Sequence, residues 1–289
     1  MSIRIIPRLD IKGPNLVKGI HLEGLRVLGK PEWFAHHYYE QGADELLYMD
    51  VVASLYQRNS LLEIVAKTSK EIFIPLTVGG GLRTLEDIRQ TLRAGADKVA
   101  LNTAAVQRPE LIREAAQQFG SSTIIVSIEA VRKSDGSYEA LFNNGRDQTG
   151  MDACRWAMQA AELGAGEIMV TSIDREGTAK GFDLELTARI SGSVGVPVIS
   201  CGGAGTLQHL HEVVAKGGAD AVCVASILHY ASQGQYKAEW DFSGEGNTEY
   251  LKNPRGLSKI EPTTLPEIKA YLVRQGVFCR PPATKETYV

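Results

Sequence analysis

Two acidic residues close apolar, strand-like segments and are candidates for proton-transfer chemistry. Asp10 closes a segment that begins at Arg4, and Glu129 closes one that begins at Thr123. A pair of carboxyl groups facing one substrate suits general acid and general base catalysis. Each could instead cap its strand or pair with a neighbouring lysine or arginine, and spacing alone leaves both interpretations open.

Two glycine-rich segments, Gly79-Gly80-Gly81 and Gly202-Gly203, each follow an apolar segment and precede a helical pattern. Small residues let backbone N–H groups approach an anion, and the start of a helix favours negative charge. The next apolar segments end in Asn102-Thr103 and Ala225-Ser226, whose side chains could complete each cradle. Glycine also serves tight turns between strand and helix, but two such loops predict a ligand with a phosphate at each end.

The elements that must position these residues are short apolar segments alternating with amphipathic helical patterns, which predicts a parallel sheet. Eight such segments fit a (β/α)8 barrel, in which the carboxyl ends of the strands form one active face. A doubly wound open sheet is the alternative, but its glycine loop usually follows the first strand. The expected strands are residues 4–10, 45–50, 74–78, 98–102, 123–129, 167–172, 197–201 and 221–225, with helices such as 31–41 and 85–94 between them.

Internal repetition supports the barrel. Gly79 precedes a Gly-Ala-Asp motif at Gly95 by 16 residues, and Gly202 precedes the same motif at Gly218 by 16. Two further pairs of segments repeat in the same order at nearly the same offset. We therefore predict two duplicated half-barrels, with Asp10 and Glu129 as symmetry-related carboxyl groups at one mouth.

Composition limits the class of protein. The 289 residues carry 31 Lys+Arg and 34 Asp+Glu, a net charge of −3 without a block of like charges, so no surface for nucleic acid or anionic membrane is expected. The amino terminus lacks the apolar core of a signal peptide, and no apolar stretch reaches the roughly 18 residues of a membrane span. We expect a cytoplasmic protein.

Metal or cofactor chemistry is not indicated. The four cysteines lie far apart without metal-binding spacing. His209 and His211 are two residues apart on a predicted helix and cannot share a face. We expect neither a metal nor a cofactor.

Taken together, the motifs resemble those of the cyclase subunit of imidazole glycerol phosphate synthase in histidine biosynthesis. The resemblance covers residues 3–228 and 265–277. It is carried by Ile5-Ile6-Pro7 with Leu9-Asp10, Leu16-Val17-Lys18-Gly19, Asp44-Glu45-Leu46, Thr77-Val78-Gly79-Gly80-Gly81, Gly95-Ala96-Asp97-Lys98-Val99, Asn102-Thr103-Ala104-Ala105, Gly164-Ala165-Gly166-Glu167-Ile168, Thr171-Ser172-Ile173-Asp174-Arg175 with Gly177-Thr178, and Gly202-Gly203-Ala204-Gly205.

The resemblance implies an activity and a partner. Members take ammonia from a glutaminase subunit docked at the bottom of the barrel and pass it through the barrel interior. At the mouth, a bis-phosphorylated ribulosyl aminoimidazole carboxamide nucleotide is split and cyclised to imidazole glycerol phosphate and aminoimidazole carboxamide ribotide.

Site residues can be carried over by position. The resemblance implies that Asp10 is a catalytic acid/base and that Lys18, in the loop after the first strand, closes over the ligand. Asp174 is expected as a further polar group at the mouth, and Gly177 in a loop over the ligand. The phosphate cradles would contain Gly80, Gly81, Asn102, Thr103, Gly202, Gly203 and Ser226, and a gate at the ammonia-channel entrance would contain Arg4, Glu45, Lys98 and Glu167.

Two departures from the family pattern concern the mouth. Glu129 replaces the second catalytic aspartate, and its longer side chain moves the carboxyl group by about 1 Å, a displacement that can cost roughly 10²-fold in rate. Arg8 replaces a small residue on the face that also carries Arg4 and Asp10. A buried guanidinium needs a partner, and we predict Glu129 across the barrel, which would hold Glu129 ionised. Cys201 replaces a serine beside the second glycine loop.

Segments outside the repeated pattern complete the expectations. Residues 231–262 form a polar insertion before the last helix, expected as a lid or partner surface, or as a disordered segment. Residues 281–289 are expected to form a flexible tail on a single barrel domain spanning 1–289.

The departures keep other functions open. A paralogue could channel ammonia to another enzyme, for example one that amidinates a surface sugar, or act on a changed phosphorylated substrate. A phosphate-ligand receptor without chemistry is a third possibility.

Overall fold

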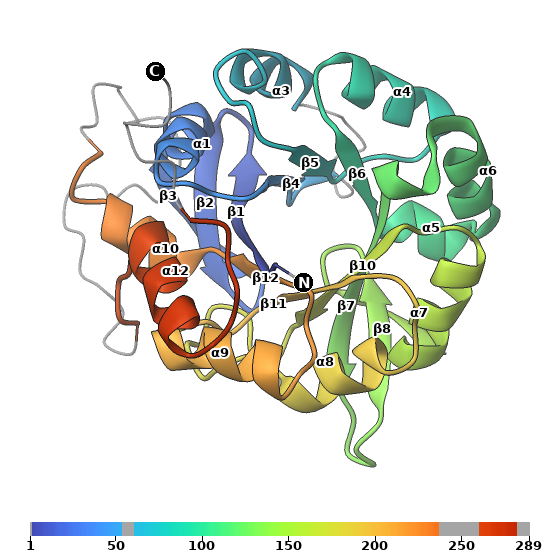
Figure 1. Ribbon diagram of the computed structural model, residues 1–289. Helices are drawn as coiled ribbons and strands as arrows, with labels where there is room; N and C mark the ends of the chain where they lie inside the picture. Colours follow the sequence, from blue (N-terminus) through green and yellow to red (C-terminus); the bar gives the residue numbers. More distant parts are fainter. Residues whose placement is uncertain (1, 54–60, 237–259, 282–289) are drawn as a thin grey trace.

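The computed structural model describes residues 2–53, 61–236 and 260–281. Among them, eight parallel strands close into a barrel with helices around it (Figure 1), because the order β10-β11-β12-β1-β4-β5-β6-β7 returns to its start through pairing of β7 with β10. The (β/α)8 prediction is confirmed, and closure of the sheet excludes the doubly wound alternative. The barrel strands are β1 (Arg4–Lys12), β4 (Leu46–Asp50), β5 (Leu76–Gly79), β6 (Lys98–Leu101), β7 (Ile124–Arg132), β10 (Glu167–Ser172), β11 (Val198–Cys201) and β12 (Ala221–Val224).

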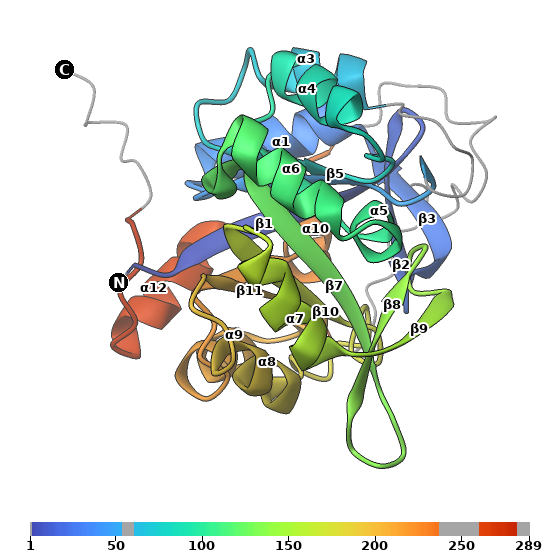
Figure 2. The ribbon, with the colours of Figure 1, turned by 90° about the vertical axis from the view of Figure 1, so that its right-hand side faces the viewer.

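The first strand of each half continues into an antiparallel hairpin that the sequence reading missed. After β1 come β2 (Asn15–Ile20) and β3 (Glu23–Gly29), and after β7 come β8 (Tyr138–Phe142) and β9 (Asp147–Asp152). In Figure 2 both hairpins lie on the side opposite the amino terminus. Two expectations are corrected: β1 and β7 extend beyond Asp10 and Glu129, and Lys18 lies on strand β2 rather than in a loop.

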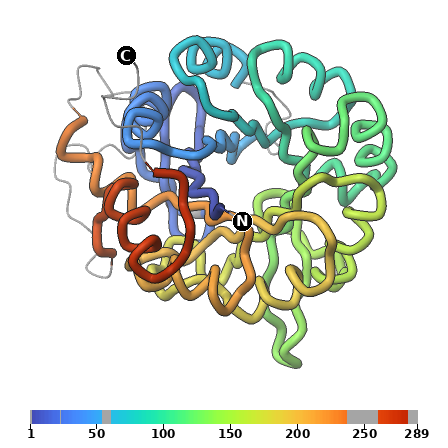
Figure 3. The backbone as a smooth tube through the Cα atoms, viewed as in Figure 1, coloured from blue at the N-terminus to red at the C-terminus, as the bar shows by residue number. Residues whose placement is uncertain are grey.

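Helices cover the outside of the barrel, as the tube in Figure 3 shows. Both helices that follow the glycine loops begin with a threonine N-cap, Thr84 and Thr206, whose hydroxyl accepts a backbone N–H of the first turn. The described helices are α1 (Pro31–Glu40), α3 (Leu62–Thr68), α4 (Leu85–Arg93), α5 (Thr103–Gln107), α6 (Glu110–Phe119), α7 (Ala153–Glu162), α8 (Leu184–Ser191), α9 (Leu207–Ala215), α10 (Ser226–Ser232) and α12 (Leu265–Arg274), with a short 3-10 turn, η1 (Ser121–Thr123).

Alternation along β1 divides the core into two layers. Ile5, Leu9 and Ile11 pack outward against the helices, whereas Ile6 joins an apolar cluster inside the barrel. The inner cluster contains Ile6, Leu47, Ala100, Ile125, Met169, Ile199, Cys201, Ala221 and Cys223. Since Arg4, Arg8 and Asp10 share the parity of Ile6, charged side chains lie inside the barrel on either side of this apolar cluster.

The expected insertion and tail fall mostly outside the described residues, which exclude 237–259 and 282–289. The described start of the insertion continues α10 to Ser232, and Tyr236 packs edge-on against Trp33 of α1. Among the described helices, none combines the length and apolar character needed to cross a bilayer.

Candidate active site

Asp10 lies inside the barrel in a cluster of paired charges. Its Oδ1 accepts a hydrogen bond from Arg8 Nε at 2.7 Å, and its Oδ2 lies 3.6 Å from Lys18 Nζ. Burial would raise the pKa of Asp10, but the positive charges of Arg8 and Lys18 outweigh it, and the pKa is lowered. Asp10 is therefore a carboxylate that can accept a proton and has none to donate at neutral pH.

Lys18 completes this cluster. Its ammonium group pairs with the carboxylate of Glu176, in the segment after β10, and both side chains are buried. With Arg8 and Asp10 they form a set of two positive and two negative charges, the balance that buried ions require. Glu176 was not among the predicted site residues; its position next to Gly177, in the loop expected over the ligand, was the available signal.

Glu129 lies across the mouth on β7 in a different environment. Its Oε2 accepts the backbone N–H of Gly145, in the β8–β9 turn, at 2.7 Å. Burial raises the pKa of Glu129 to about 7, against the opposing effects of Arg8 and of the Gly145 hydrogen bond. Near neutral pH this carboxyl group can hold a proton and donate it.

The predicted Arg8–Glu129 pair is wrong. Arg8 pairs with Asp10, two residues further along the same face of β1, and its Nη1 lies 3.5 Å from both Thr171 Oγ1 and Cys201 Sγ. A neighbour on its own strand satisfies the guanidinium without a reach across the barrel. Glu129 is consequently not held ionised by a direct ion pair.

The first predicted phosphate cradle lies on a pocket of about 590 Å³, and Gly80, Gly81, Asn102 and Thr103 all line it together with Glu129. Gly80 has φ +94°, and a Cβ there would lie 2.3 Å from the Asp50 carbonyl oxygen, so the turn requires glycine. Sequence reasoning missed two guanidinium groups that also line the pocket, those of Arg83 and Arg108. The structure thus gathers the residues of the first cradle beside the carboxyl group with the raised pKa.

The residues of the second predicted cradle lie together, but little space is left between them. Lys18, Gly177, Gly202, Gly203 and Ser226 line a cavity of only about 20 Å³. The Glu176 carboxylate occupies this region, since its Oε2 lies 3.2 Å from the position that a Cβ on Gly202 would take. With Glu176 in this position, the cavity has no room for a group the size of a phosphate.

Asp174 does not line either cradle. Its carboxylate accepts the backbone N–H of Arg132 at 2.9 Å and faces a separate surface pocket that Lys133, Arg175 and Lys180 also line. The structure therefore separates Asp174 from the other predicted ligand-binding residues.

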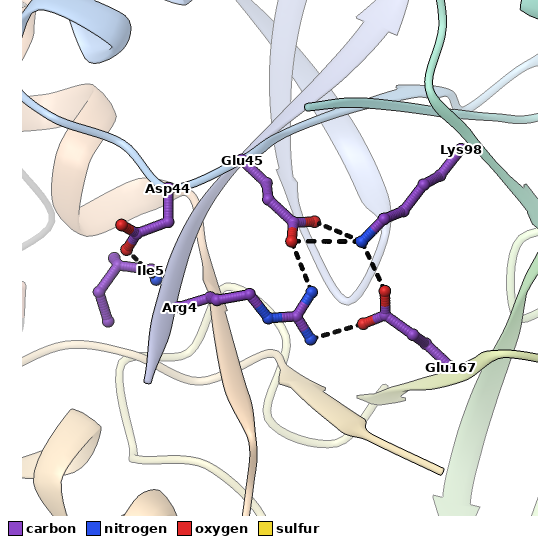
Figure 4. A network of polar contacts seen from close by, with 6 residues as sticks. All are labelled: Arg4, Ile5, Asp44, Glu45, Lys98 and Glu167. Carbon is purple, nitrogen blue, oxygen red and sulfur yellow. Dashed lines mark hydrogen bonds and ion pairs between the residues drawn. The ribbon is translucent and has the colours of Figure 1, made fainter. Parts of the chain in front are cut away.

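At the opposite end of the barrel, the four predicted gate residues form a closed ring of alternating charge (Figure 4). Arg4 donates to Glu45 and to Glu167, each at 2.5 Å. Lys98 Nζ lies 3.1 Å from Glu45 Oε2 and 2.6 Å from Glu167 Oε1. Burial would raise the pKa of Glu167, but hydrogen bonds from Arg4 and Lys98 lower it, so the ring favours the ionised form of this carboxyl group.

Fold and site together define the class of this protein as a (β/α)8 barrel with two acidic groups and two glycine loops at its mouth. Known proteins with similar sequences belong to the same class. A family model described as histidine biosynthesis protein matches residues 4–233. An imidazole glycerol phosphate synthase subunit HisF from Legionella pneumophila is 57% identical over 210 residues, which cover 73% of this chain and 99% of that relative. Another relative of the same name, from Alkaliphilus metalliredigens, is 48% identical over 227 residues, covering 78% and 90% respectively.

The chain therefore belongs to the histidine biosynthesis family of (β/α)8 barrels, and its relatives place it among the enzyme subunits of that family, as the resemblance predicted. Both relatives are named as subunits, which implies that such chains work in a complex with a partner subunit.

Proposed function

We propose that the chain is an ammonia-dependent lyase/cyclase. It would convert the bis-phosphorylated ribulosyl aminoimidazole carboxamide nucleotide to imidazole glycerol phosphate and aminoimidazole carboxamide ribotide, with ammonia from a glutaminase partner. The observation that carries this proposal is the opposite shift of two carboxyl groups at one mouth: the pKa of Asp10 is lowered and that of Glu129 is raised to about 7. Groups whose environments push their pKa values apart take the base and acid roles of a reaction.

The roles follow from the protonation states. Asp10, as the carboxylate, accepts a proton from the nitrogen that adds to the ribulosyl carbonyl carbon. Glu129, as the acid, donates a proton to the oxygen that leaves as water. Gly80, Gly81, Asn102 and Thr103 would hold one phosphate in the large pocket beside Glu129.

Binding of the other phosphate requires a rearrangement at the second cradle. A phosphate there takes the place of the Glu176 carboxylate beside Gly202 and Gly203 and can pair with Lys18 instead. Release of Glu176 from Lys18 would then loosen the charge cluster around Asp10. Ligand binding and availability of the catalytic base are coupled in this way.

Replacement of Glu176 by glutamine tests this coupling. The change removes the negative charge that pairs with Lys18, so a phosphate no longer has to displace it, and an interaction between charges about 4 Å apart amounts to between about 1 and 4 kcal/mol. We expect the Kd for inorganic phosphate, measured by titration calorimetry, to fall by roughly five-fold or more. An unchanged Kd would show that Glu176 does not compete with the anion; Glu162→Gln, at the exposed end of α7, is the matched control.

The ring at the barrel bottom is proposed as the ammonia gate, and Lys98→Met tests it. Loss of Lys98 leaves Glu45 and Glu167 with Arg4 as their only ring partner. We expect turnover with ammonium chloride to persist and turnover with glutamine and the glutaminase partner to become less efficient, because the ring no longer closes on itself. Equal losses with both nitrogen sources would contradict a gate role and point to a general loss of fold.

A second candidate function is favoured by the position of Arg8. Its guanidinium lies within the barrel between the apolar cluster and Asp10, in the path from the bottom ring to the mouth. Together with the narrow second cradle, this favours a paralogue that acts on a changed phosphorylated substrate or delivers ammonia to another enzyme, such as one amidinating a surface sugar.

One assay separates these functions. The purified chain is supplied with the nucleotide substrate and ammonium chloride, and the aminoimidazole product is followed by absorbance. Product formation, together with complementation of a histidine auxotroph, supports the cyclase. No turnover and no complementation, with glutaminase binding intact, support the paralogue, whereas tight substrate binding without conversion supports a receptor.

A further inference from the structure

Two cysteines face one another inside the barrel, just below the second glycine loop. Cys201 on β11 and Cys223 on β12 are register partners on adjacent parallel strands. Both side chains belong to the inner apolar cluster, and the residues are 4% and 1% exposed. Neither thiol takes part in the proposed cyclase chemistry.

The surroundings make the two thiols unequal. The pKa of Cys201 is lowered to about 7, first because Cys223 donates a hydrogen bond to its sulfur and then, against burial, because Arg8 Nη1 lies 3.5 Å away. Burial raises the pKa of Cys223. Glu176 is the nearby negative group that opposes ionisation of Cys201. Cys201 therefore has the character of an attacking thiolate, and Cys223 that of a resolving thiol.

A small molecule can reach the pair from the mouth. Both cysteines line the cavity of about 20 Å³ at the second cradle, a volume sufficient for one molecule about the size of water. Hydrogen peroxide has two oxygen atoms and needs more room than water, so its entry requires a shift of the Glu176 carboxylate that lies at this cradle. Cys154 and Cys279 lie outside this cavity and have raised pKa values, in both cases because of burial.

We propose that Cys201 and Cys223 are a dithiol site that peroxide oxidises reversibly to a disulfide. The Cys201 thiolate attacks one peroxide oxygen, the O–O bond breaks, and the hydroxide that leaves takes up the proton released when Cys201 ionised. Cys223 sulfur then attacks the Cys201 sulfenic acid, the S–O bond breaks, and the Cys223 proton leaves with the oxygen as a second water. Two electrons pass from the two thiols to one peroxide.

The strand geometry accommodates the product. Paired residues on adjacent parallel strands have Cα atoms about 4.8 Å apart, within the range of about 4.4 to 6.8 Å that disulfides span. Where disulfides form in a reducing compartment, they are usually transient and serve catalysis or redox sensing. The site is independent of the proposed function, because its readout is the covalent state of the chain.

The test uses the reduced full chain and a stoichiometric amount of hydrogen peroxide. We expect the thiols titrated after denaturation to fall from four to two, the intact mass to decrease by two hydrogens, and dithiothreitol to restore both. Peptide mapping is expected to link Cys201 to Cys223. Four remaining thiols, or a bridge through Cys154 or Cys279, would overturn the proposal.

Variants separate a specific site from general oxidation. In Cys223→Ser we expect no loss of two hydrogens and instead a Cys201 sulfenic acid that dimedone captures. The matched variant Cys154→Ser keeps both cysteines of the pair and is expected to form the disulfide at the wild-type rate. Disulfide formation that persists in Cys223→Ser, or that requires Cys154, would refute the assignment.

Discussion

Asp10→Asn is expected to abolish measurable cyclase turnover and to destabilise the fold. As the proposed general base, Asp10 contributes on the order of 10² to 10⁴ in rate. Its removal also leaves Arg8 buried without its carboxylate, and breaking a buried ion pair from one side costs about 3 to 5 kcal/mol. Turnover with ammonium chloride and the free energy of unfolding in denaturant measure the two effects.

A double variant separates the two effects. Arg8→Met combined with Asp10→Asn removes the unpaired charge together with its partner, so most of the lost stability should return while turnover stays absent. Asp135→Asn, on the exposed tip of the β7–β8 hairpin, is the control and should change neither quantity. Wild-type turnover in Asp10→Asn would remove Asp10 from the mechanism, and a stable Asp10→Asn single variant would contradict the charge balance described here.

The repeated pattern was sufficient to predict the barrel. The spacing of apolar residues and the positions of glycines depend only on neighbouring residues, so both can be recognised in the sequence. Glycine loops precede Thr84 and Thr206, each of which caps the helix after its loop. Strand alternation likewise predicted that Arg8 shares one face of its strand with Arg4 and Asp10. These features follow from backbone geometry, which the residue types at each position largely determine.

The hairpins and the charge pairings were not predictable in the same way. In the second hairpin, Asn144-Gly145 is a turn signal, with φ of 59° and 74°. The segments on either side, however, lack the alternation of apolar and polar residues that usually marks strands. The partner of Arg8 was predicted wrongly because several carboxylates lie within reach of a long side chain, and local geometry selected the nearest. Closure of the second cradle by Glu176 depends on a tertiary contact with Lys18 that no spacing in the sequence reveals.

Glu129→Gln is expected to lower activity and raise stability at alkaline pH. In the wild type, the unfolded chain ionises Glu129 near its ordinary pKa of 4.5, whereas burial keeps the folded group protonated up to about pH 7. Between these values the unfolded state binds fewer protons, so the contribution of Glu129 to stability is lost as pH rises. The cost above pH 7 approaches about 3 kcal/mol, and glutamine, which cannot ionise, avoids it.

The activity of the same variant should change in the opposite direction. Wild-type kcat is expected to fall above about pH 7 as the proposed acid loses its proton. In Glu129→Gln, kcat should be lower by roughly 10² to 10⁴-fold and should no longer fall with pH in this range. Unfolding in denaturant at pH 5 and pH 8 measures the stability difference, with the exposed Glu162→Gln as a control that should follow the wild type. If the free energies of unfolding of Glu129→Gln and wild type differed by the same amount at both pH values, Glu129 would be ionised in the folded chain and could not act as the acid. A variant that gains stability at pH 8 while it loses turnover would establish that the chain keeps an unfavourably buried carboxyl group for its chemistry.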